Sequence, residues 1–504
     1  MTDLTAVARA TRRPGLHRAW AVAAATFLAL VAAAAFRSSI GVLIEPIERD
    51  LGWTRSWTSA AVAVNFMFYG LVAPFAASLM ERFGIRQVVA FALLLFAAGS
   101  GLTLIMRQPW QLIALWGVVV GFGAGSMAVG FGAMVANRWF VARRGLVTGA
   151  FSATSATGQL VFLPAVAWLA TSFGWRSAEG LISVLALLTV PLVLALLVNR
   201  PADVGLQPYG APVALEAPEA PEAPEAPGMI TALRGQVTAG RGIGAQTGDH
   251  EHEDAALGPA AALVGTAAAT AAAAGTAAAT ATSAGTAAAT ATSAGTAVAR
   301  VGALGELRRL SSSWAFWALT LTFFVCGWST NGLVGTHFVA AAGDHGMPPT
   351  TAASMLVLIG IFDILGTLGS GWLSDRVDSR LLLLGYYGLR GLSLLAFPAA
   401  LGPHVQPTLL LLIAFYGLDW VATVPPTVAL CRQHFGLART GVAFGWVFAG
   451  HMVGAAFAAQ FAGVVREVVG TYEPAWWTAG GLCLVAACLA LTIPYRDPTA
   501  ADLA

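Results

Sequence analysis

The sequence predicts an all-α membrane protein of twelve transmembrane helices in two pseudo-symmetric six-helix bundles. Only 10% of the 504 residues are charged and 57% are hydrophobic, whereas about a quarter of a soluble protein is charged. Most of the exterior must therefore face lipid. Apolar runs of about 20 residues, the length that spans a bilayer, recur along the chain. Two short motifs also repeat nearly 300 residues apart, which indicates a duplicated unit.

The apolar runs form two groups of six. The first group is expected at residues 18–44, 56–79, 87–106, 110–136, 146–170 and 177–198. The second group is expected at residues 312–341, 350–373, 381–401, 407–431, 439–465 and 475–494. Because the hydrocarbon core offers no water to backbone groups, each run is predicted to be a helix.

The stretch between the two groups has a different composition. It contains a Glu-Ala-Pro run at residues 216–227 and Gly-Thr-Ala repeats that begin at Gly265. The alanine-rich repeat stretch has almost no Leu, Ile or Phe, so little apolar area could be buried there. We therefore predict five regions, which are a cytoplasmic tail (1–17), a first bundle (18–198), a disordered cytoplasmic linker (199–311), a second bundle (312–495) and a cytoplasmic tail (496–504).

The charges between the predicted spans indicate the orientation. The connections after the fourth and tenth spans are basic, with Arg138, Arg143 and Arg144 in the first and Arg432 and Arg439 in the second. Basic connections stay in the cytoplasm, so both termini are predicted to be cytoplasmic. The alanine- and arginine-rich composition suggests a bacterial cytoplasmic (inner) membrane.

Several classes of protein are excluded. The sequence has no basic stripe for nucleic acid, no glycine-rich nucleotide loop and no metal-ligand spacing among its His and Cys residues. No Ser-His-acid arrangement is evident either. We therefore expect no enzyme activity, no cofactor and no metal. The expected partners are the bilayer, protons and a small molecule, and the protein is expected to act as a monomer.

The repeated motifs lie in corresponding places of the two halves. Glu81-Arg82 with Arg86 stands after the second span, and Asp375-Arg376 with Arg380 stands 294 residues later, after the eighth. At the start of the fifth and eleventh spans, an arginine and two glycines repeat at an offset of 296, as Arg143, Gly145 and Gly149 and as Arg439, Gly441 and Gly445. Membrane proteins built from such repeats commonly bind a substrate between the halves and rock around it. On the fourth span, Gly117, Gly121 and Gly125 are spaced for close helix packing, and so are the pairs Gly145 and Gly149, and Gly441 and Gly445.

One copy of the motif resembles a family signature. Gly371-Trp372-Leu373-Ser374-Asp375-Arg376, followed by Arg380, is similar to G-x-L-x-D-R-x-G-x-R of the major facilitator superfamily. The first copy departs from it at Ala77 and Glu81, and the second at Asp378, where the pattern has glycine. An acid and arginines at helix ends predict a breakable latch, although they could instead only set the topology. The predicted gating residues are Glu81, Arg82, Arg86, Gly371, Asp375, Arg376 and Arg380.

Four charged residues fall inside predicted spans, where an unpaired charge is costly. They are Arg37, Asp363, Arg390 and Asp419. The last three lie about 15–18 Å from the cytoplasmic ends at 1.5 Å per residue. Each is a candidate functional residue. Alternatively, Arg390 and Asp419 form a permanent ion pair between neighbouring helices.

The region around Arg37 is similar to the monocarboxylate-transporter branch of the superfamily. Phe36-Arg37-Ser38 precedes Ile47-Glu48 at the spacing of that branch, whose basic residue in the first helix engages the substrate. Asp363 stands eight residues before Gly371, where the branch has its proton-linked aspartate. Thr367 departs from the branch, which has arginine at that position.

The resemblance and the buried charges together predict proton-coupled transport of a small, monocarboxylate-like organic anion by alternating access. Arg37 and Arg390 would hold the carboxylate, and Asp363 and Asp419 would carry the proton. The polar residues predicted to line the site are Asn65, Tyr69, Asn331 and His337, each of which could instead make a helix–helix hydrogen bond. The alternative function is efflux of drugs or amphipathic metabolites.

Overall fold

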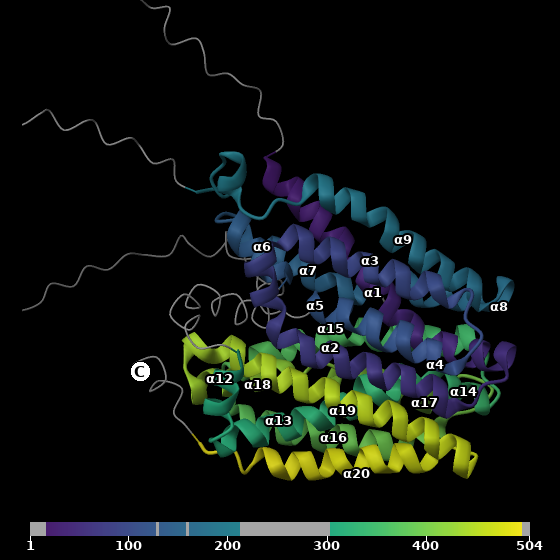
Figure 1. Cartoon of the computed structure of the whole chain (residues 1–504). Coiled ribbons are helices and arrows are strands. Elements are labelled where there is room, and N and C mark those ends of the chain that lie inside the picture. The colour runs from purple at the N-terminus through teal and green to yellow at the C-terminus, as the bar shows by residue number, and fades with distance from the viewer. Residues whose placement is uncertain (1–16, 128–130, 158–160, 212–302, 496–504) are drawn as a thin grey trace, which may run out of the picture. The chain divides into compact units, whose positions relative to one another are not determined.

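The computed structural model describes residues 17–127, 131–157, 161–211 and 303–495 (Figure 1). This part of the chain is almost entirely helical and contains no β-strand beyond one isolated bridge between Phe140 and Tyr209. The all-α fold predicted from the apolar runs is confirmed.

Helices of the first half run from Arg18 to Val204, and several are interrupted. They are α1 (Arg18–Leu51), α2 (Arg55–Phe83), α3 (Ile85–Thr103), α4 (Pro109–Leu112), the π-helix η1 (Ile113–Val120), α5 (Gly121–Ser126), α6 (Phe131–Trp139), α7 (Arg144–Thr157), α8 (Leu163–Phe173), α9 (Trp175–Leu196) and the 3₁₀-helix η3 (Pro201–Val204).

Helices of the second half follow the same plan. They are α12 (Ala303–Leu310), α13 (Trp314–Gly327), the π-helix η4 (Trp328–Val334), α14 (Gly335–Asp344), α15 (Pro349–Ser374), α16 (Ser379–Ala400), α17 (Pro407–Asp419), α18 (Val424–Phe435), the 3₁₀-helix η5 (Leu437–Arg439), α19 (Thr440–Val469) and α20 (Glu473–Ala490).

Helix occupies each of the twelve predicted spans. Within the described ranges, nine helical segments are long and apolar enough to cross a bilayer, and the pair Ala303–Leu310 and Trp314–Asp344, bent by 104°, would be a tenth. Two predicted spans remain, the one shared by α7 and α8 and the one at α20. The count of twelve therefore stays a prediction.

The two halves repeat each other in helix position and in packing. Helix α2 begins at Arg55 and α15 at Pro349, and α3 and α16 begin at Ile85 and Ser379, both 294 residues apart. The contact between the second and fourth spans also recurs. A Cβ on Gly121 would lie within 3.0 Å of Phe68, and a Cβ on Gly417 within 2.7 Å of the equivalent Phe362.

The glycines of the fourth span act as predicted. Gly117, Gly121 and Gly125 all lie against α2, with room for no side chain, and so let the two backbones approach closely. Gly145 and Gly445 of the second repeated motif differ, because a Cβ on either would meet nothing within 4 Å. The close packing predicted for those two glycines is therefore not found among the described residues.

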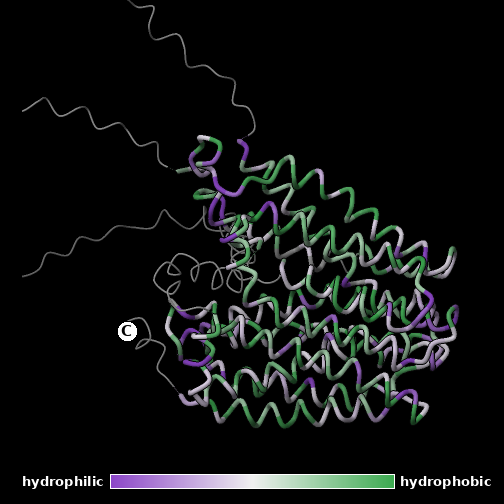
Figure 2. Tube along the Cα trace, in the orientation of Figure 1, coloured by the Kyte–Doolittle hydropathy of each residue, from purple (hydrophilic) through white to green (hydrophobic). Residues whose placement is uncertain are grey.

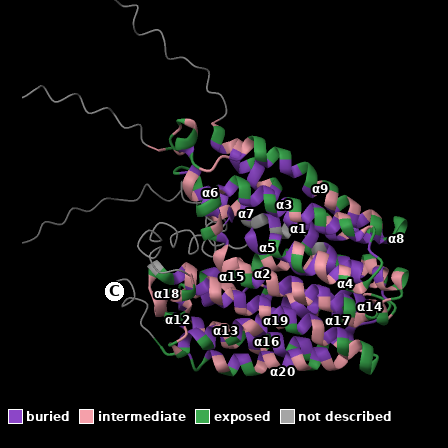
Figure 3. Ribbon diagram, in the orientation of Figure 1, coloured by how far each residue is buried: buried purple, intermediate pink, exposed green. Residues whose placement is uncertain are grey.

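The exterior is suited to lipid. Hydrophobic residues run along the helices, while hydrophilic ones gather toward the helix ends (Figure 2). Exposed residues lie on outward helix faces (Figure 3), and they include large apolar side chains such as Leu365 (58%), Leu392 (58%) and Leu411 (71%). Exposure of so much apolar surface to water would be unfavourable, so these faces contact acyl chains.

The halves meet along a seam that includes three main helix pairs. Helix α2 packs along α19, α1 contacts α14, and α8 contacts α15. We call the end that holds Arg138, Arg144, Arg432 and Arg439 the basic end, which lies at the left of Figure 1, and the opposite end the far end.

The predicted linker is described only at its edges. Residues 199–211 include η3, and residues 303–311 include α12, so both edges carry short helices. The Glu-Ala-Pro run, the glycine-spaced repeats and both predicted tails, apart from His17, lie outside the described residues.

Candidate functional site

A buried charge cluster surrounds a break in the tenth predicted span. Helix α17 ends at Asp419 and α18 begins at Val424, with Pro425 and Pro426 in its first turn. Proline has no N–H to donate, so the chain there cannot continue a regular helix. Inside a membrane the backbone groups freed by such a break must find partners in the protein.

Arg390 of α16 supplies partners on one side of the break. Its side chain is completely buried and forms an ion pair with Asp419. Its Nη2 donates to the carbonyl oxygens of Asp419 (2.5 Å) and Trp420 (3.3 Å). Its Nη1 donates to Cys326 Sγ (3.2 Å) and Ser329 Oγ (3.4 Å), which belong to α13 and η4. One guanidinium thus ties three spans together at the break.

Helix α15 supplies partners on the other side. Asp363 Oδ1 accepts the backbone N–H of Val421 (3.0 Å) and the hydroxyl of Thr367 (3.0 Å). Ser370 Oγ donates to the carbonyl oxygen of Ala422 (2.5 Å). Thr367, which stands where the monocarboxylate-transporter branch has arginine, therefore gives Asp363 a neutral donor in place of a cation.

Arg37 lies apart from this cluster, at the seam between the halves. Its Nη1 is 3.5 Å from the hydroxyl of Tyr69 on α2, and its side chain is exposed. Tyr69 in turn meets Phe448 of α19 edge to face, with 5.8 Å between ring centroids. Arg37 is therefore a cation at a place where both halves contribute side chains.

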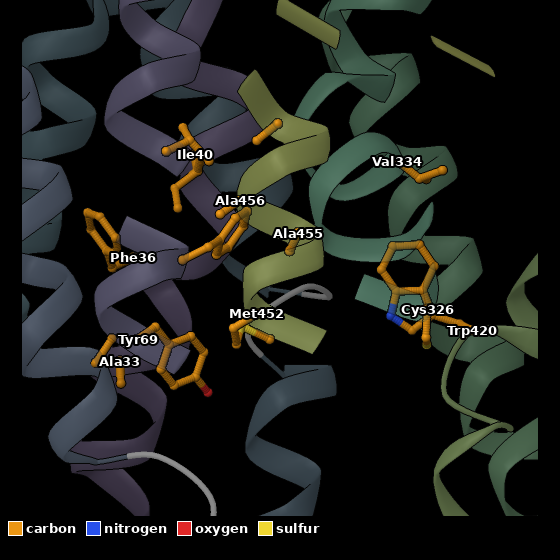
Figure 4. Packing of buried hydrophobic residues seen from close by; sticks show 14 of the residues in the cluster. Ala33, Phe36, Ile40, Tyr69, Cys326, Val334, Trp420, Met452, Ala455 and Ala456 are labelled. Atoms are coloured by element: carbon orange, nitrogen blue, oxygen red, sulfur yellow. The ribbon is translucent and has the colours of Figure 1, made fainter. Parts of the chain in front are cut away.

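The seam continues from Phe448 into the second half. Phe448 stacks on His451 at 5.7 Å, and His451 Nε2 is 3.1 Å from Asn331 Nδ2 of η4. Figure 4 shows Phe36 and Tyr69 on one side of α19 and Cys326 and Trp420 on the other. Arg37, Tyr69 and Asn331 thus belong to one line of contacting side chains. Sequence reasoning offered no signal for Phe448.

The other predicted substrate residues lie elsewhere. Asn65 is buried in the first half and donates to the carbonyl oxygen of Trp116 (2.6 Å). His337 is completely buried toward the far end, where Nε2 contacts Ala459 O (2.8 Å) and Nδ1 contacts the Tyr472 hydroxyl (3.3 Å). Arg390 is held by Asp419, which favours the ion-pair interpretation of those two residues.

The predicted gating residues lie at the basic end, and the polar contacts that the structure gives them stay within one half. In the first half Glu81 pairs with Arg138, and the Arg86 N–H donates to Asn199 Oδ1 (3.0 Å). In the second half Arg376 donates to Trp372 O (3.0 Å) and lies over its ring.

Asp378, the departure from the family signature, has a structural role. Its carboxylate accepts the backbone N–H of Arg380 (3.0 Å) at the start of α16 and pairs with the Arg380 side chain (2.6 Å). The hydrogen bonds from Arg380 lower the pKa of the Asp378 carboxyl.

A cavity of about 240 Å³ lies at the far end, between α1, α8, α14 and α15. Its polar side chains are Glu45, Arg49 and Thr171, and neither Arg37 nor Asp363 lines it. It is smaller than the 300–1,000 Å³ typical of ligand pockets, so the line of side chains from Arg37 to Asn331 is the better candidate site.

Comparison with known proteins agrees with this architecture. A model of the Major Facilitator Superfamily matches residues 26–237 and 319–503. Monocarboxylate transporter 13 of Rattus norvegicus is 33% identical over 162 residues, which are 32% of this chain and 37% of that protein. The uncharacterized MFS-type transporter YcxA of Bacillus subtilis (strain 168) is 28% identical over 169 residues, 33% of this chain and 38% of that protein.

A third relative is the probable L-galactonate transporter of Escherichia coli (strain K12), 27% identical over 153 residues, 30% of this chain and 33% of that protein. The chain thus spans less than two fifths of the length of these relatives, but the family match covers most of the chain. The helical halves, the signature around Gly371 and these matches lead to one conclusion. The chain belongs to the Major Facilitator Superfamily and resembles its monocarboxylate-transporter branch.

Proposed function

We propose that this transporter moves a small organic anion together with a proton across a bacterial cytoplasmic membrane, with its basic end in the cytoplasm. The names of two relatives specify acids, a monocarboxylate and L-galactonate, which supports an organic anion as substrate. The arginines at the basic end support the orientation, because basic connections are retained in the cytoplasm.

The position of Arg37 carries the proposal. A guanidinium can hold a carboxylate by two parallel hydrogen bonds, and this one lies at the seam with the Tyr69 hydroxyl beside it. A substrate bound there would contact both halves, which alternating access around a central site requires. Asn331 lies in the same line of side chains and would contact the rest of the substrate.

Asp363 is the proposed proton carrier. The two hydrogen bonds that the structure gives it come from neutral donors, Val421 N–H and the Thr367 hydroxyl. A carboxylate charge in the membrane interior is costly, and a proton removes that charge. Hydrogen bonds to an ionised acceptor are about twice as strong as neutral ones. Protonation would therefore weaken the hold of α15 on the break between α17 and α18.

Arg390 and Asp419 then support the break. The complete burial of Arg390 and its use of carbonyl, thiol and hydroxyl acceptors leave the ion pair enclosed by protein. In this mechanism the pair fixes α16 to α17. Protonation of Asp363 would meanwhile weaken the hydrogen bond between α15 and the backbone of the break.

Uptake by proteoliposomes tests the proposal. We would measure labelled monocarboxylates and sugar acids with and without an imposed proton gradient. Arg37→Gln removes a charged hydrogen-bond donor, a loss of about 1.5–3 kcal/mol, so apparent affinity should fall at least about tenfold. Arg176→Gln is the matched control, because Arg176 is a half-exposed arginine of the same half that pairs with Asp50.

Asp363→Asn separates coupling from binding. Asparagine keeps an oxygen acceptor for Val421 but cannot carry the proton, so exchange of substrate should continue while gradient-driven accumulation is lost. Undiminished accumulation by Asp363→Asn would remove this residue from the coupling role. No uptake of any carboxylate, together with resistance to amphipathic toxins in cells that express the protein, would establish the efflux alternative.

A further inference from the structure

Polar side chains at the far end join the two halves. Arg55, the first residue of α2, donates from Nε to Glu48 Oε2 (2.9 Å) and from Nη1 to the hydroxyl of Tyr472 (2.5 Å). Glu48 belongs to the first half and Tyr472 to the second. The backbone N–H of Ser56 also donates across the seam, to Glu467 Oε2 of α19 (2.9 Å).

The contacts of Tyr472 form a chain in which every donor meets an acceptor. His337 Nε2 lies 2.8 Å from the carbonyl oxygen of Ala459, so Nε2 carries the hydrogen. In a neutral ring Nδ1 then accepts, and the Tyr472 hydroxyl donates to it over 3.3 Å. The hydroxyl oxygen remains an acceptor for Arg55. Tyr472 is therefore held from both sides by groups that fix its orientation.

The hydrogen-bonded residues Arg55, Tyr472 and His337 are largely shielded from water. Tyr472 is 2% exposed and His337 is completely buried, while the side chains of Arg55 and Glu48 are 14% and 12% exposed. Water has little access to replace the contact between Arg55 and Tyr472. Close approach of the halves nearby, where a Cβ on Gly463 would meet Ser59 Oγ at 2.1 Å, keeps the region closed.

The ion pair of Arg55 lies within the first half, whereas only uncharged hydrogen-bond partners of Arg55 come from the second half. The charge of Arg55 is balanced by Glu48 of its own half, and Thr58 supports that carboxylate with a hydrogen bond of 2.5 Å. Separation of the halves would therefore break the contacts to Tyr472 and Glu467 without leaving a buried arginine unpaired. Such a contact can break and re-form without stranding a charge.

We propose that Glu48, Arg55, His337 and Tyr472 form a gate that closes the far side, and that this gate must open in each transport cycle. In the proposed orientation the gate faces the outside of the cell. The inference goes beyond the proposed function, because it holds for any substrate and needs no coupling ion.

Distance measurements between spin labels test the gate without any substrate. Ile105→Cys and His404→Cys place labels on exposed far-end connections of the first and second halves, in a Cys488→Ser background that removes the exposed native cysteine. Tyr472→Phe keeps the ring but removes the hydroxyl. We expect the ratio of the long-distance population to the short-distance population to rise about tenfold, which is the effect of losing one hydrogen bond to a charged group.

Two further variants make the result decisive. Glu467→Ala removes the second contact across the seam from an exposed position, so it should fold and should shift the same populations by a smaller factor. Arg466→Gln is the control, since Arg466 pairs with Asp344 within the second half at the same end, and it should leave the distances unchanged. An unchanged distribution in Tyr472→Phe and Glu467→Ala, or an equal shift in Arg466→Gln, would overturn the proposal.

Discussion

In the second half, three charged side chains surround the break between α17 and α18, whereas the first half has uncharged residues at the corresponding positions. With the offset of 294 that relates α2 to α15 and α3 to α16, Asp363 corresponds to Tyr69 and Arg390 to Phe96. The stretch that corresponds to Asp419 lies among the uncharged residues 121–125.

This difference distinguishes the helix packing that both halves share from the charged residues that only the second half has at these positions. Both halves pack the second span on the fourth through glycine, Gly121 in one and Gly417 in the other. Since the first half achieves that packing without charge, the charges of the second half are not required by the bundle itself. They hold the broken tenth span, in line with the roles that we propose for Asp363 and for the Arg390–Asp419 pair.

The largest expected effect comes from splitting the buried pair. Arg390→Leu would leave Asp419 buried without its cation, and loss of one partner from such a pair costs about 3–5 kcal/mol. The corresponding Phe96→Leu in the first half removes only apolar contacts and should cost about 1 kcal/mol. Unfolding free energies in mixed micelles, titrated with SDS, would measure both.

The double variant Arg390→Leu/Asp419→Leu decides between the two interpretations of the pair. If the pair is structural, the double variant should regain most of the lost stability and should still bind the anion. A double variant that regains stability but no longer binds any anion would place Arg390 back in the substrate site. If stability is not regained, the two residues do not act as a pair.

A smaller effect should be equal in the two halves. Gly121→Ala and Gly417→Ala each place a Cβ within 3.0 Å of the second span of their half. Overpacking of this kind costs about 1–3 kcal/mol. Gly369→Ala is the control, because its Cβ would meet nothing within 4 Å. Replacing a helical glycine by alanine there should stabilise the fold by at most about 1 kcal/mol. Unequal losses at Gly121 and Gly417 would show that the halves do not share this contact.

Local patterns in the sequence predict the helices and the glycine contacts of the fourth span, because each depends on residues close together in the chain. The recurrence of two such patterns predicts the duplication. Local patterns also place Asp363, Arg390 and Asp419 at similar depth. The sequence cannot predict that Arg390 caps backbone carbonyls at a break, since that depends on how α16 turns toward α17. Pro425-Pro426 was the available signal for the break itself.

Contacts between distant segments were missed for the same reason. Arg55 and Tyr472 are 417 residues apart and meet only when the halves pack. Glu179 stands five residues into α9, near the far end, where a carboxylate would ordinarily reach water. It is instead completely buried. Position along a helix predicts depth, but it does not predict which face is enclosed.

The smallest expected effect concerns one position of the signature, where the two halves use different residues and different backbone conformations to begin a helix. Gly84 precedes α3 with a φ of 85°, whereas the corresponding Asp378 precedes α16 with an ordinary φ of −53° and caps the helix with its side chain. Gly84→Ala should cost about 1–2 kcal/mol, because φ 85° with ψ 144° is a backbone conformation that is essentially restricted to glycine. Asp378→Ala loses a cap, about 1 kcal/mol.

The pH dependence of Asp378→Asn isolates the charge from the cap. Arg380 lowers the pKa of Asp378 in the folded protein, so ionisation of this carboxyl stabilises the fold above its unfolded value of about 3.9. That contribution is lost as the pH falls through the lower folded value. The stability difference between wild type and Asp378→Asn should therefore be constant from neutral pH to about 5 and shrink below about 4. A difference that persists unchanged in acid would mean that it does not arise from the charge of Asp378.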